Sequence, residues 1–343
     1  MTSRIADSAR TMLWRKRGEI LEGFPLEEVS DHLDEDGSLV WVDLCNPGHE
    51  VLGRLAEELS LDPHAVEDSV TAVTERPKAT RHVSHTFVTV YATRLETGPG
   101  ADARRGLTDS RLEISRVSTF VLPRGIVTVR RDDRFDMDEV VQRWSDRPDL
   151  VDEGSGALLH GLLDVVVDGH FDTIQQMDDA IESLEDGLFD EHGSARALQQ
   201  HTYRLRKELV ELRRVVLPMR EVVNTVMRHR ADVNGHSIEL DGWYTDLYDH
   251  VLRASEWTES LRDMVTTVFE TNIALQDARL NAVMKKLTGW AAIIAVPTAV
   301  TGWFGMNVRY PGIGTFVGFL ASTAVIILLA STLFVLFRRK SWI

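Results

Sequence analysis

A seven-residue repeat of oxygen-bearing and small side chains runs through the C-terminal part of the sequence. One column reads Asp249, Glu256, Asp263, Glu270, Asp277, Met284, Ala291, Thr298 and Gly305, and a companion column four residues on includes Ala274, Asn281, Thr288, Ala295 and Gly302. A sustained period of seven keeps one stripe of a helix facing its neighbours in a bundle. Carboxylate and amide oxygens are ligands that hard divalent cations prefer, so the repeat suits cation handling.

Two interpretations of this stripe remain open for its apolar part. Small and hydroxyl residues allow transmembrane helices to pack closely, or the stripe lines a water-filled path. Acidic residues at every seventh position would repel one another at a tight helix seam, but a solvated face or a cation-filled funnel tolerates them. We interpret Asp249, Glu256 and Asp263 as a solvated face, and Glu270 and Asp277 as an acidic funnel.

Two uncharged segments place the end of the repeat in a membrane. Leu287 to Val308 and Tyr310 to Phe337 contain no charged side chain. A helix needs about 20 apolar residues to cross a bilayer core. The sequence therefore predicts spans at about 287–307 and 316–337, joined by an outer loop at 308–315.

Basic residues flank this hairpin at its two ends. The flanks carry Lys285, Lys286, Arg338, Arg339 and Lys340, whereas the loop carries only Arg309. Lys and Arg concentrate on the cytoplasmic side of membrane proteins. We therefore expect a multi-pass protein of the cell membrane, surrounded by lipid, with both termini in the cytoplasm and these five residues forming a basic ring.

The remainder of the chain divides into an α/β part and a helical part. Residues 1–150 predict a cytosolic α/β domain, with strands at 39–44, 85–95, 117–122 and 125–129 and helices at 26–33, 50–59 and 63–70. Residues 151–239 predict a pair of helical arms, the second kinked at Pro218. Residues 240–307 predict one stalk helix that continues into the first span, and 338–343 form a basic cytosolic tail.

The negative charge of the chain argues against nucleic acid as a partner. The 343 residues carry a formal net charge of -15, and such a body would repel nucleic acid phosphates. Cys45 is the single cysteine, so an intrachain disulfide is excluded and a reducing cytosol is natural. The segment from Met1 to Leu21 is charged throughout and has no apolar core of signal-peptide length.

Gly305-Met306-Asn307, at the end of the first predicted span, is a known signature. With the C-terminal hairpin and basic tail, it resembles the CorA family of two-span magnesium channels. Other segments that resemble this family are Asn281-Ala282-Val283-Met284-Lys285, Glu67-Asp68, Glu75-Arg76-Pro77-Lys78 and the arm residues 209–222. The resemblance covers nearly the whole chain and implies an α+β cytosolic domain of α/β/α type, long helices, a transmembrane hairpin and a homopentamer.

The resemblance also implies roles for residues on the stalk helix. Gly305, Met306 and Asn307 would form a selectivity filter at the outer mouth, where a ring of amide oxygens holds hydrated Mg²⁺. Met284 and Leu287 would form an apolar gate that blocks ions by dewetting. The rest of the pore lining would be Asn281, Thr288, Ala291, Ala295, Thr298 and Gly302.

Regulation by cytosolic Mg²⁺ is a further implication of the resemblance. Regulatory ions would bind between neighbouring cytosolic domains, Asp68 with Asp246 and Glu67 with Asp164. Carboxylates that face each other repel until a divalent ion neutralises them, so low internal Mg²⁺ would loosen the ring.

Two alternatives to a magnesium channel stay open. The outer loop has no acidic residue to attract cations, so it leaves the ion preference open. A zinc transporter of the related ZntB type is the first alternative, although Met306 favours the magnesium branch, and Co²⁺, Ni²⁺ and Zn²⁺ are further candidate cargo. A membrane-anchored enzyme is the second alternative, but the sequence has no phosphate loop, no Gly-x-Gly-x-x-Gly, no Gly-x-Ser-x-Gly and no His-Glu-x-x-His motif.

Overall fold

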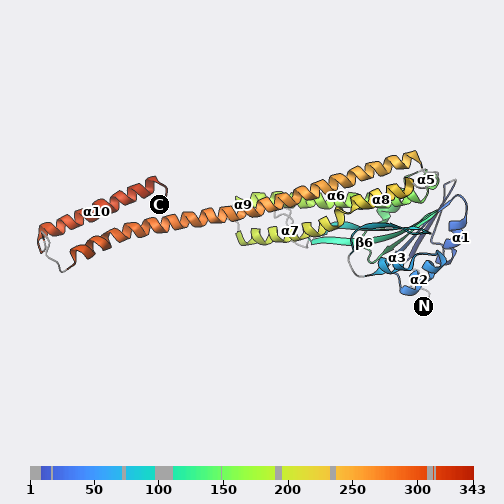
Figure 1. The fold of residues 1–343 in the computed structure, drawn as a ribbon, viewed down its shortest axis with the longest axis horizontal. Coiled ribbons are helices and arrows are strands. Elements are labelled where there is room, and N and C mark those ends of the chain that lie inside the picture. The colour runs from blue at the N-terminus through green and yellow to red at the C-terminus, as the bar shows by residue number, and fades with distance from the viewer. Residues whose placement is uncertain are drawn as a thin grey trace. The chain divides into compact units, whose positions relative to one another are not determined.

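The computed structural model divides the chain into two compact units, Met1–Val268 and Phe269–Ile343 (Figure 1). Their boundary falls inside one long helix, α9 (Ile238–Phe304). The structure describes residues 9–16, 18–71, 75–96, 111–147, 149–189, 195–231, 237–306, 312 and 314–343. Residues 98–106 and 232–236, whose sequences predict a loop and a turn, lie outside these residues.

A seven-stranded sheet forms the centre of the first unit. Its strand order is β2-β1-β3-β7-β6-β5-β4. β3 pairs with β7 in parallel and the remaining pairs are antiparallel. The strands are β1 (Ala9–Arg15), β2 (Glu19–Glu22), β3 (Ser38–Cys45), β4 (Lys78–Arg81), β5 (Thr86–Glu96), β6 (Arg111–Leu122) and β7 (Gly125–Arg130).

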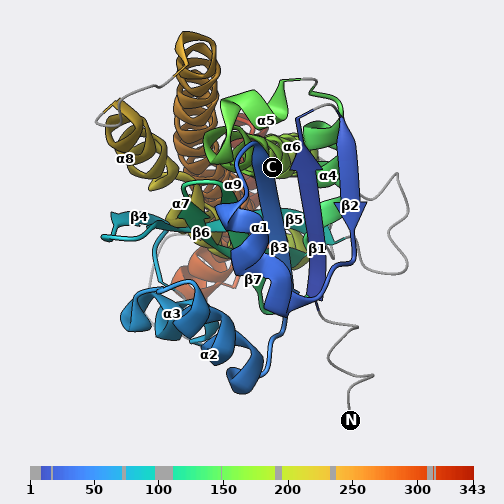
Figure 2. The same cartoon turned by 90° about the vertical axis from the view of Figure 1, so that its right-hand side faces the viewer.

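Helices cover both faces of this sheet because its central strands are apolar on both sides. Along β3, Leu39 and Trp41 join one hydrophobic cluster, whereas Val40 and Val42 join the other, as the two-residue period of a strand requires. One face packs against α4 (Met137–Ser145), α5 (Leu150–Glu153) and α6 (Ser155–Leu188); the other packs against η3 (Leu26–Glu28), α1 (Val29–Asp34), α2 (His49–Glu58) and α3 (Pro63–Val70) (Figure 2).

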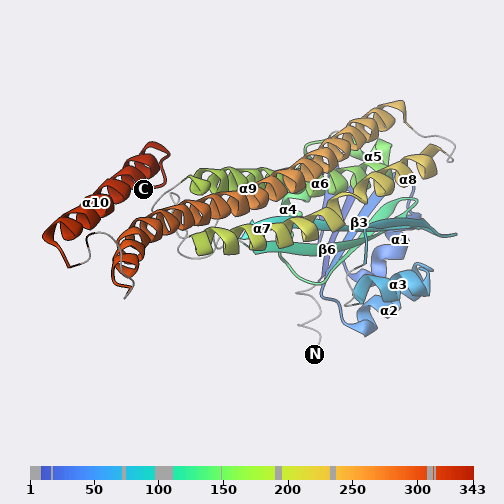
Figure 3. The same cartoon turned by 60° about the vertical axis from the view of Figure 1, so that its left-hand side comes forward.

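Long helices complete the first unit. α6, α7 (Ala195–Val216) and α8 (Met219–Ala231) lie alongside the N-terminal part of α9 (Figure 3). The buried face of α9 reads Leu240, Tyr244, Leu247, Val251, Ala254, Thr258, Leu261, Val265 and Val268. These steps of three and four residues make a continuous apolar stripe on one side of the helix.

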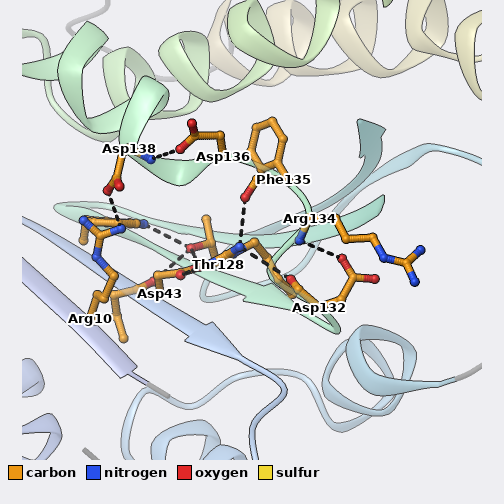
Figure 4. Close-up of polar contacts among 11 residues, drawn as sticks. Arg10, Asp43, Thr128, Asp132, Arg134, Phe135, Asp136 and Asp138 are labelled. Atoms are coloured by element: carbon orange, nitrogen blue, oxygen red, sulfur yellow. Dashed lines mark hydrogen bonds and ion pairs between the residues drawn. The ribbon is translucent and has the colours of Figure 1, made fainter. Parts of the chain in front are cut away.

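A buried ion pair closes the carboxyl ends of the parallel strands β3 and β7 (Figure 4). Arg130 Nη2 lies 2.6 Å from Asp43 Oδ2, and the two side chains are 7% and 1% exposed. Thr128 Oγ1 donates to the same carboxylate over 2.7 Å, and Arg130 Nη1 donates to the Phe135 carbonyl over 3.0 Å. Each charge is thus both paired and hydrogen-bonded, as burial demands.

Most local expectations for the first unit are confirmed. The strands expected at 39–44, 85–95, 117–122 and 125–129 appear as β3, β5, β6 and β7, and Asp62 caps α3 through bonds to the amides of His64 and Ala65. Gly125, the first residue of β7, lies too close to β3 for a larger side chain, because an added Cβ would lie 2.5 Å from the Val40 carbonyl oxygen.

β1, β2, β4, α4 and α5 were not predicted from the sequence, and the expectation for Pro218 was wrong. β1 and β2 lie in the N-terminal segment, where charged residues at strand edges hid the buried Met12, Leu13 and Trp14. α4 was missed, although Asp136 caps it. Pro218 does not kink one helix but separates two, because α7 ends at Val216 and α8 begins at Met219.

Candidate ion path and regulatory sites

The second unit pairs the end of α9 with α10 (Phe316–Arg339), and both helices are long and apolar enough to cross a membrane. Gly289 is the contact point, since its added Cβ would meet Ile343 and Phe337 at 3.1 and 3.7 Å. Trp290 and Phe334 bring their rings to 6.5 Å. The residues of α9 with reduced exposure continue this face: Gly289, Ala292, Ile293, Val296, Pro297, Val300 and Phe304.

The predicted pore-lining stripe lies on the part of α9 that α10 leaves uncovered. All of its described members are exposed in the single chain: Asn281, Met284, Leu287, Thr288, Ala291, Ala295, Thr298, Gly302, Gly305 and Met306. The same helix thus has one face against α10 and another that carries the amide, hydroxyl and small side chains. Trp290, Ile294 and Trp303 are also exposed, so apolar surface flanks the stripe.

Threonine hydroxyls on this helix donate hydrogen bonds to backbone carbonyls four residues earlier in the same helix. Thr298 Oγ1 donates to the Ile294 carbonyl over 3.2 Å, and Thr301 Oγ1 donates to the Pro297 carbonyl over 2.8 Å. A hydroxyl has one donor and two acceptor lone pairs. The oxygen of Thr298 therefore keeps acceptor capacity for a hydrated cation.

The predicted filter begins where α9 ends. The Gly305 amide donates to the Thr301 carbonyl over 2.8 Å, and a Cβ on Gly305 would lie 2.9 Å from that same oxygen. Glycine therefore lets the chain leave the helix without a clash. Asn307, which the sequence places in the filter, lies outside the described residues, as does most of the expected loop at 308–315.

The charged residues around the stripe are solvated in the single chain. Glu270 and Asp277, the expected funnel, are exposed on α9, as are Asp249, Glu256 and Asp263. The basic flanks Lys285, Lys286, Arg338, Arg339 and Lys340 are exposed as well. The tail folds back through a 2.9 Å bond from the Trp342 amide to the Phe337 carbonyl, with the two rings stacked at 5.4 Å.

Asp68, the first expected regulatory ligand, lies at the end of α3 and is already ion-paired. Lys78 Nζ is 2.6 Å from Asp68 Oδ2 and 2.6 Å from Glu75 Oε2. Burial lowers the pKa of Lys78, but the two carboxylates outweigh that effect and the pKa is raised. Glu67 on the same helix and Asp246 on α9 are exposed.

Asp164, the other expected ligand, lies in a half-buried cluster. One oxygen of Asp164, one of Asp168 and a ring nitrogen of His250 all lie within 4.8 Å of one another. Arg143 from α4 pairs with Asp164 and, at 2.9 Å, with Asp168. Burial raises the pKa of Asp168, although Arg143 opposes that shift.

The donor set of this cluster could hold a cation only in competition with Arg143. Two carboxylates suit Mg²⁺, whereas an imidazole suits transition metals. Sequence reasoning missed Asp168 and His250. The four-residue step from Asp164 to Asp168 on one helix face could have indicated the first, but nothing local indicates that His250 on α9 approaches them.

Comparison with known proteins matches these features to a transporter family. The family described as CorA-like Mg²⁺ transporter protein matches residues 36–339. The cobalt/magnesium transport protein CorA of Thermotoga maritima is 27% identical over 86% of this chain and 80% of that protein. The zinc transport protein ZntB of Cronobacter sakazakii is 24% identical over 83% of each.

A solved structure has the same architecture. The CorA magnesium transporter from Methanocaldococcus jannaschii gives a TM-score of 0.75 at 20% identity, covering 98% of this chain and 99% of that one. This likeness confirms the expected fold: an α/β/α domain, long helices and two C-terminal apolar helices.

Proposed function

The chain belongs to the family of CorA-like Mg²⁺ transporter proteins, and we propose that it is a channel that carries chiefly Mg²⁺ across the cell membrane. Co²⁺, Ni²⁺ and Zn²⁺ are secondary cargo in this proposal. The family is one of transporters, which favours transport over the membrane-anchored enzyme.

The division of α9 into two faces is the observation that supports this proposal best. A helix used only as an anchor needs no uncovered stripe that holds Thr288 and Thr298 in lipid, where polar groups are costly. Five copies that turn this stripe toward a common axis would bury it around water. The homopentamer follows from the family resemblance, and the basic flanks support termini in the cytoplasm.

The pore residues act by size and by oxygen chemistry in this proposal. Mg²⁺ gives up its water reluctantly, so amide oxygens of Asn307 and nearby carbonyls bind its hydration shell. Met284 and Leu287 provide a narrow apolar segment that conducts only when wetted. Glu270 and Asp277 raise the local concentration of cations at the cytoplasmic end.

Cytosolic Mg²⁺ closes the channel by binding between the cytosolic domains. The proposed ligands are Asp68 with Asp246, and Glu67 with Asp164, to which the structure adds Asp168 and His250 as neighbours of Asp164. A divalent ion neutralises carboxylates that otherwise repel, so its loss loosens the ring.

Ion flux into liposomes tests the proposal. We expect Mg²⁺ uptake by the wild-type chain and at least a tenfold loss in Asn307→Ala, because the filter loses its amide oxygen. Asn224→Ala, within α8 of the first unit, is the matched control and should leave flux unchanged. Zn²⁺ uptake that follows an imposed pH gradient, without Mg²⁺ flux, would establish the ZntB-like alternative. Absence of any divalent flux would contradict both.

A further inference from the structure

Lys78 lies between two carboxylates: Asp68 at the end of α3, a proposed regulatory ligand, and Glu75, which precedes β4. Its ammonium is 2.6 Å from both Asp68 and Glu75, and the three side chains are 35%, 33% and 33% exposed. A lysine ammonium has three donors, so it satisfies two carboxylates at once. The ammonium group of Lys78 therefore occupies the position that a divalent ion bound to Asp68 would take.

Both partners are held by fixed elements. Arg116 of β6 donates to the backbone carbonyls of Asp68 and, over 3.2 Å, of Thr71, so it anchors the end of α3. Lys78 begins β4 and pairs with Thr89 of β5. Neither side chain belongs to a free loop, and the ion pair is thus built into the fold of the domain.

The second expected regulatory carboxylate has a similar arrangement. Arg143 pairs with Asp164 and Asp168 on α6, as Lys78 pairs with Asp68 and Glu75. Each pair of acids already holds one positive charge from its own chain. Mg²⁺ that binds there must compete with a tethered cation as well as with water.

We propose that Lys78 is a tethered counter-cation that competes with Mg²⁺ for Asp68 and thereby sets the cytosolic concentration at which the regulatory site fills. This inference rests on the proposed function. The lysine carries one charge and stays near its carboxylates at every ion concentration, so it weakens Mg²⁺ binding without preventing it. It also reduces the repulsion between subunits when the ion is absent.

Substitution of Lys78 tests the competition directly. In the purified full-length protein, the readout is the Mg²⁺ concentration that gives half-maximal protection from limited proteolysis. Lys78→Met should lower that concentration about fivefold, the effect of one partly exposed ion pair. Lys78→Arg keeps the charge and should stay close to wild type. Lys16→Met is the matched control, because Lys16 pairs with Asp152 at 3.0 Å on another surface.

A second substitution has an expected effect of opposite sign. Glu75→Gln leaves Lys78 with Asp68 as its one carboxylate, so the half-maximal Mg²⁺ concentration should rise two- to threefold. Thermal unfolding of each variant without Mg²⁺ shows whether it is folded, and a shift for the folded Glu75→Gln tests the idea even if Lys78→Met unfolds.

The outcomes separate this inference from the proposed function. If the wild type neither transports Mg²⁺ nor gains protection, the proposed function fails. If the wild type does both but Lys78→Met is unchanged, or requires more Mg²⁺, the competition is wrong and Lys78 serves to position Asp68 for the ion. A fall in Glu75→Gln would overturn it equally.

Discussion

At the residue scale, the ion pair of Asp43 and Arg130 in the first unit is almost completely buried. Asp43→Ala leaves the guanidinium of Arg130 buried without its carboxylate, which destabilises proteins by about 3–5 kcal/mol. We expect this loss in the free energy of unfolding, measured by denaturant titration of the detergent-solubilised protein.

An exposed ion pair on α2 is the control for this prediction. Arg54 and Glu50 approach to 2.6 Å but are 65% and 81% exposed. Glu50→Ala should therefore change the free energy of unfolding by about 0.5 kcal/mol or less. Similar losses for Asp43→Ala and Glu50→Ala would show that burial does not make the Asp43 pair special.

His170 gives the same unit a pH-dependent stability. It is fully buried in α6, and its Nε2–H donates to the Tyr91 carbonyl over 2.8 Å. Burial lowers its pKa from 6.5 to about 4, although the bond to Tyr91 opposes the shift. The folded state thus disfavours the charged imidazole, so this contribution is present above pH 6.5 and is lost as pH falls toward 4.

His170→Gln should reduce this acid sensitivity. At 1.36 kcal/mol for each pKa unit, the wild type loses about 3 kcal/mol through His170 between pH 6.5 and 4, which the variant does not lose. Unfolding titrations at several pH values measure the difference. His64→Gln, at an exposed position, should retain the wild-type slope; equal slopes for wild type and His170→Gln would refute the assignment.

At the element scale, α9 has two faces with different expected environments. In a Cys45→Ser background, Thr298→Cys should react with a charged, water-soluble thiol reagent, because it lies on the uncovered stripe. Val300→Cys lies on the face toward α10, and its modification should be at least tenfold slower because charged reagents do not enter apolar contacts. Mass spectrometry of the membrane-embedded protein measures both rates.

The reverse result would have a clear meaning. If Thr298→Cys stays unmodified while Val300→Cys reacts, the amide and hydroxyl stripe does not face water. The small residues would then serve helix packing, which was the other interpretation of the same sequence pattern.

At the scale of the whole molecule, the negative net charge of the chain creates an electrostatic potential that attracts cations. The net charge is -15, and the expected funnel residues Glu270 and Asp277 are exposed. Glu270→Gln with Asp277→Asn should lower Mg²⁺ flux roughly two- to tenfold at low ionic strength, with a much smaller effect at high salt, because salt screens steering. Asp249→Asn with Glu256→Gln is the control pair; equal loss at every salt concentration would contradict steering.

The sequence by itself determined the two C-terminal apolar helices, the length of α9 and the stripe on it. These features depend on the seven-residue spacing of side chains and on the length of segments without charge. Both are properties of residues that are close together in the sequence, so the uncharged segment from Leu287 to Val308 and the seven-residue columns were enough to predict them. Strands such as β3 and β5 were recognisable for the same reason, since their side chains are apolar in runs bounded by turns.

Only the tertiary structure decided which distant residues meet. It paired β3 with β7, placed β1 and β2 in the sheet, and brought Arg143, Asp168 and His250 from three helices to one cluster. It also brought Lys78 into an ion pair with Asp68. A local pattern fixes the face on which a side chain lies, but packing of the whole sheet and its helices selects the partner on the opposing element, because those contacts join segments far apart in the chain.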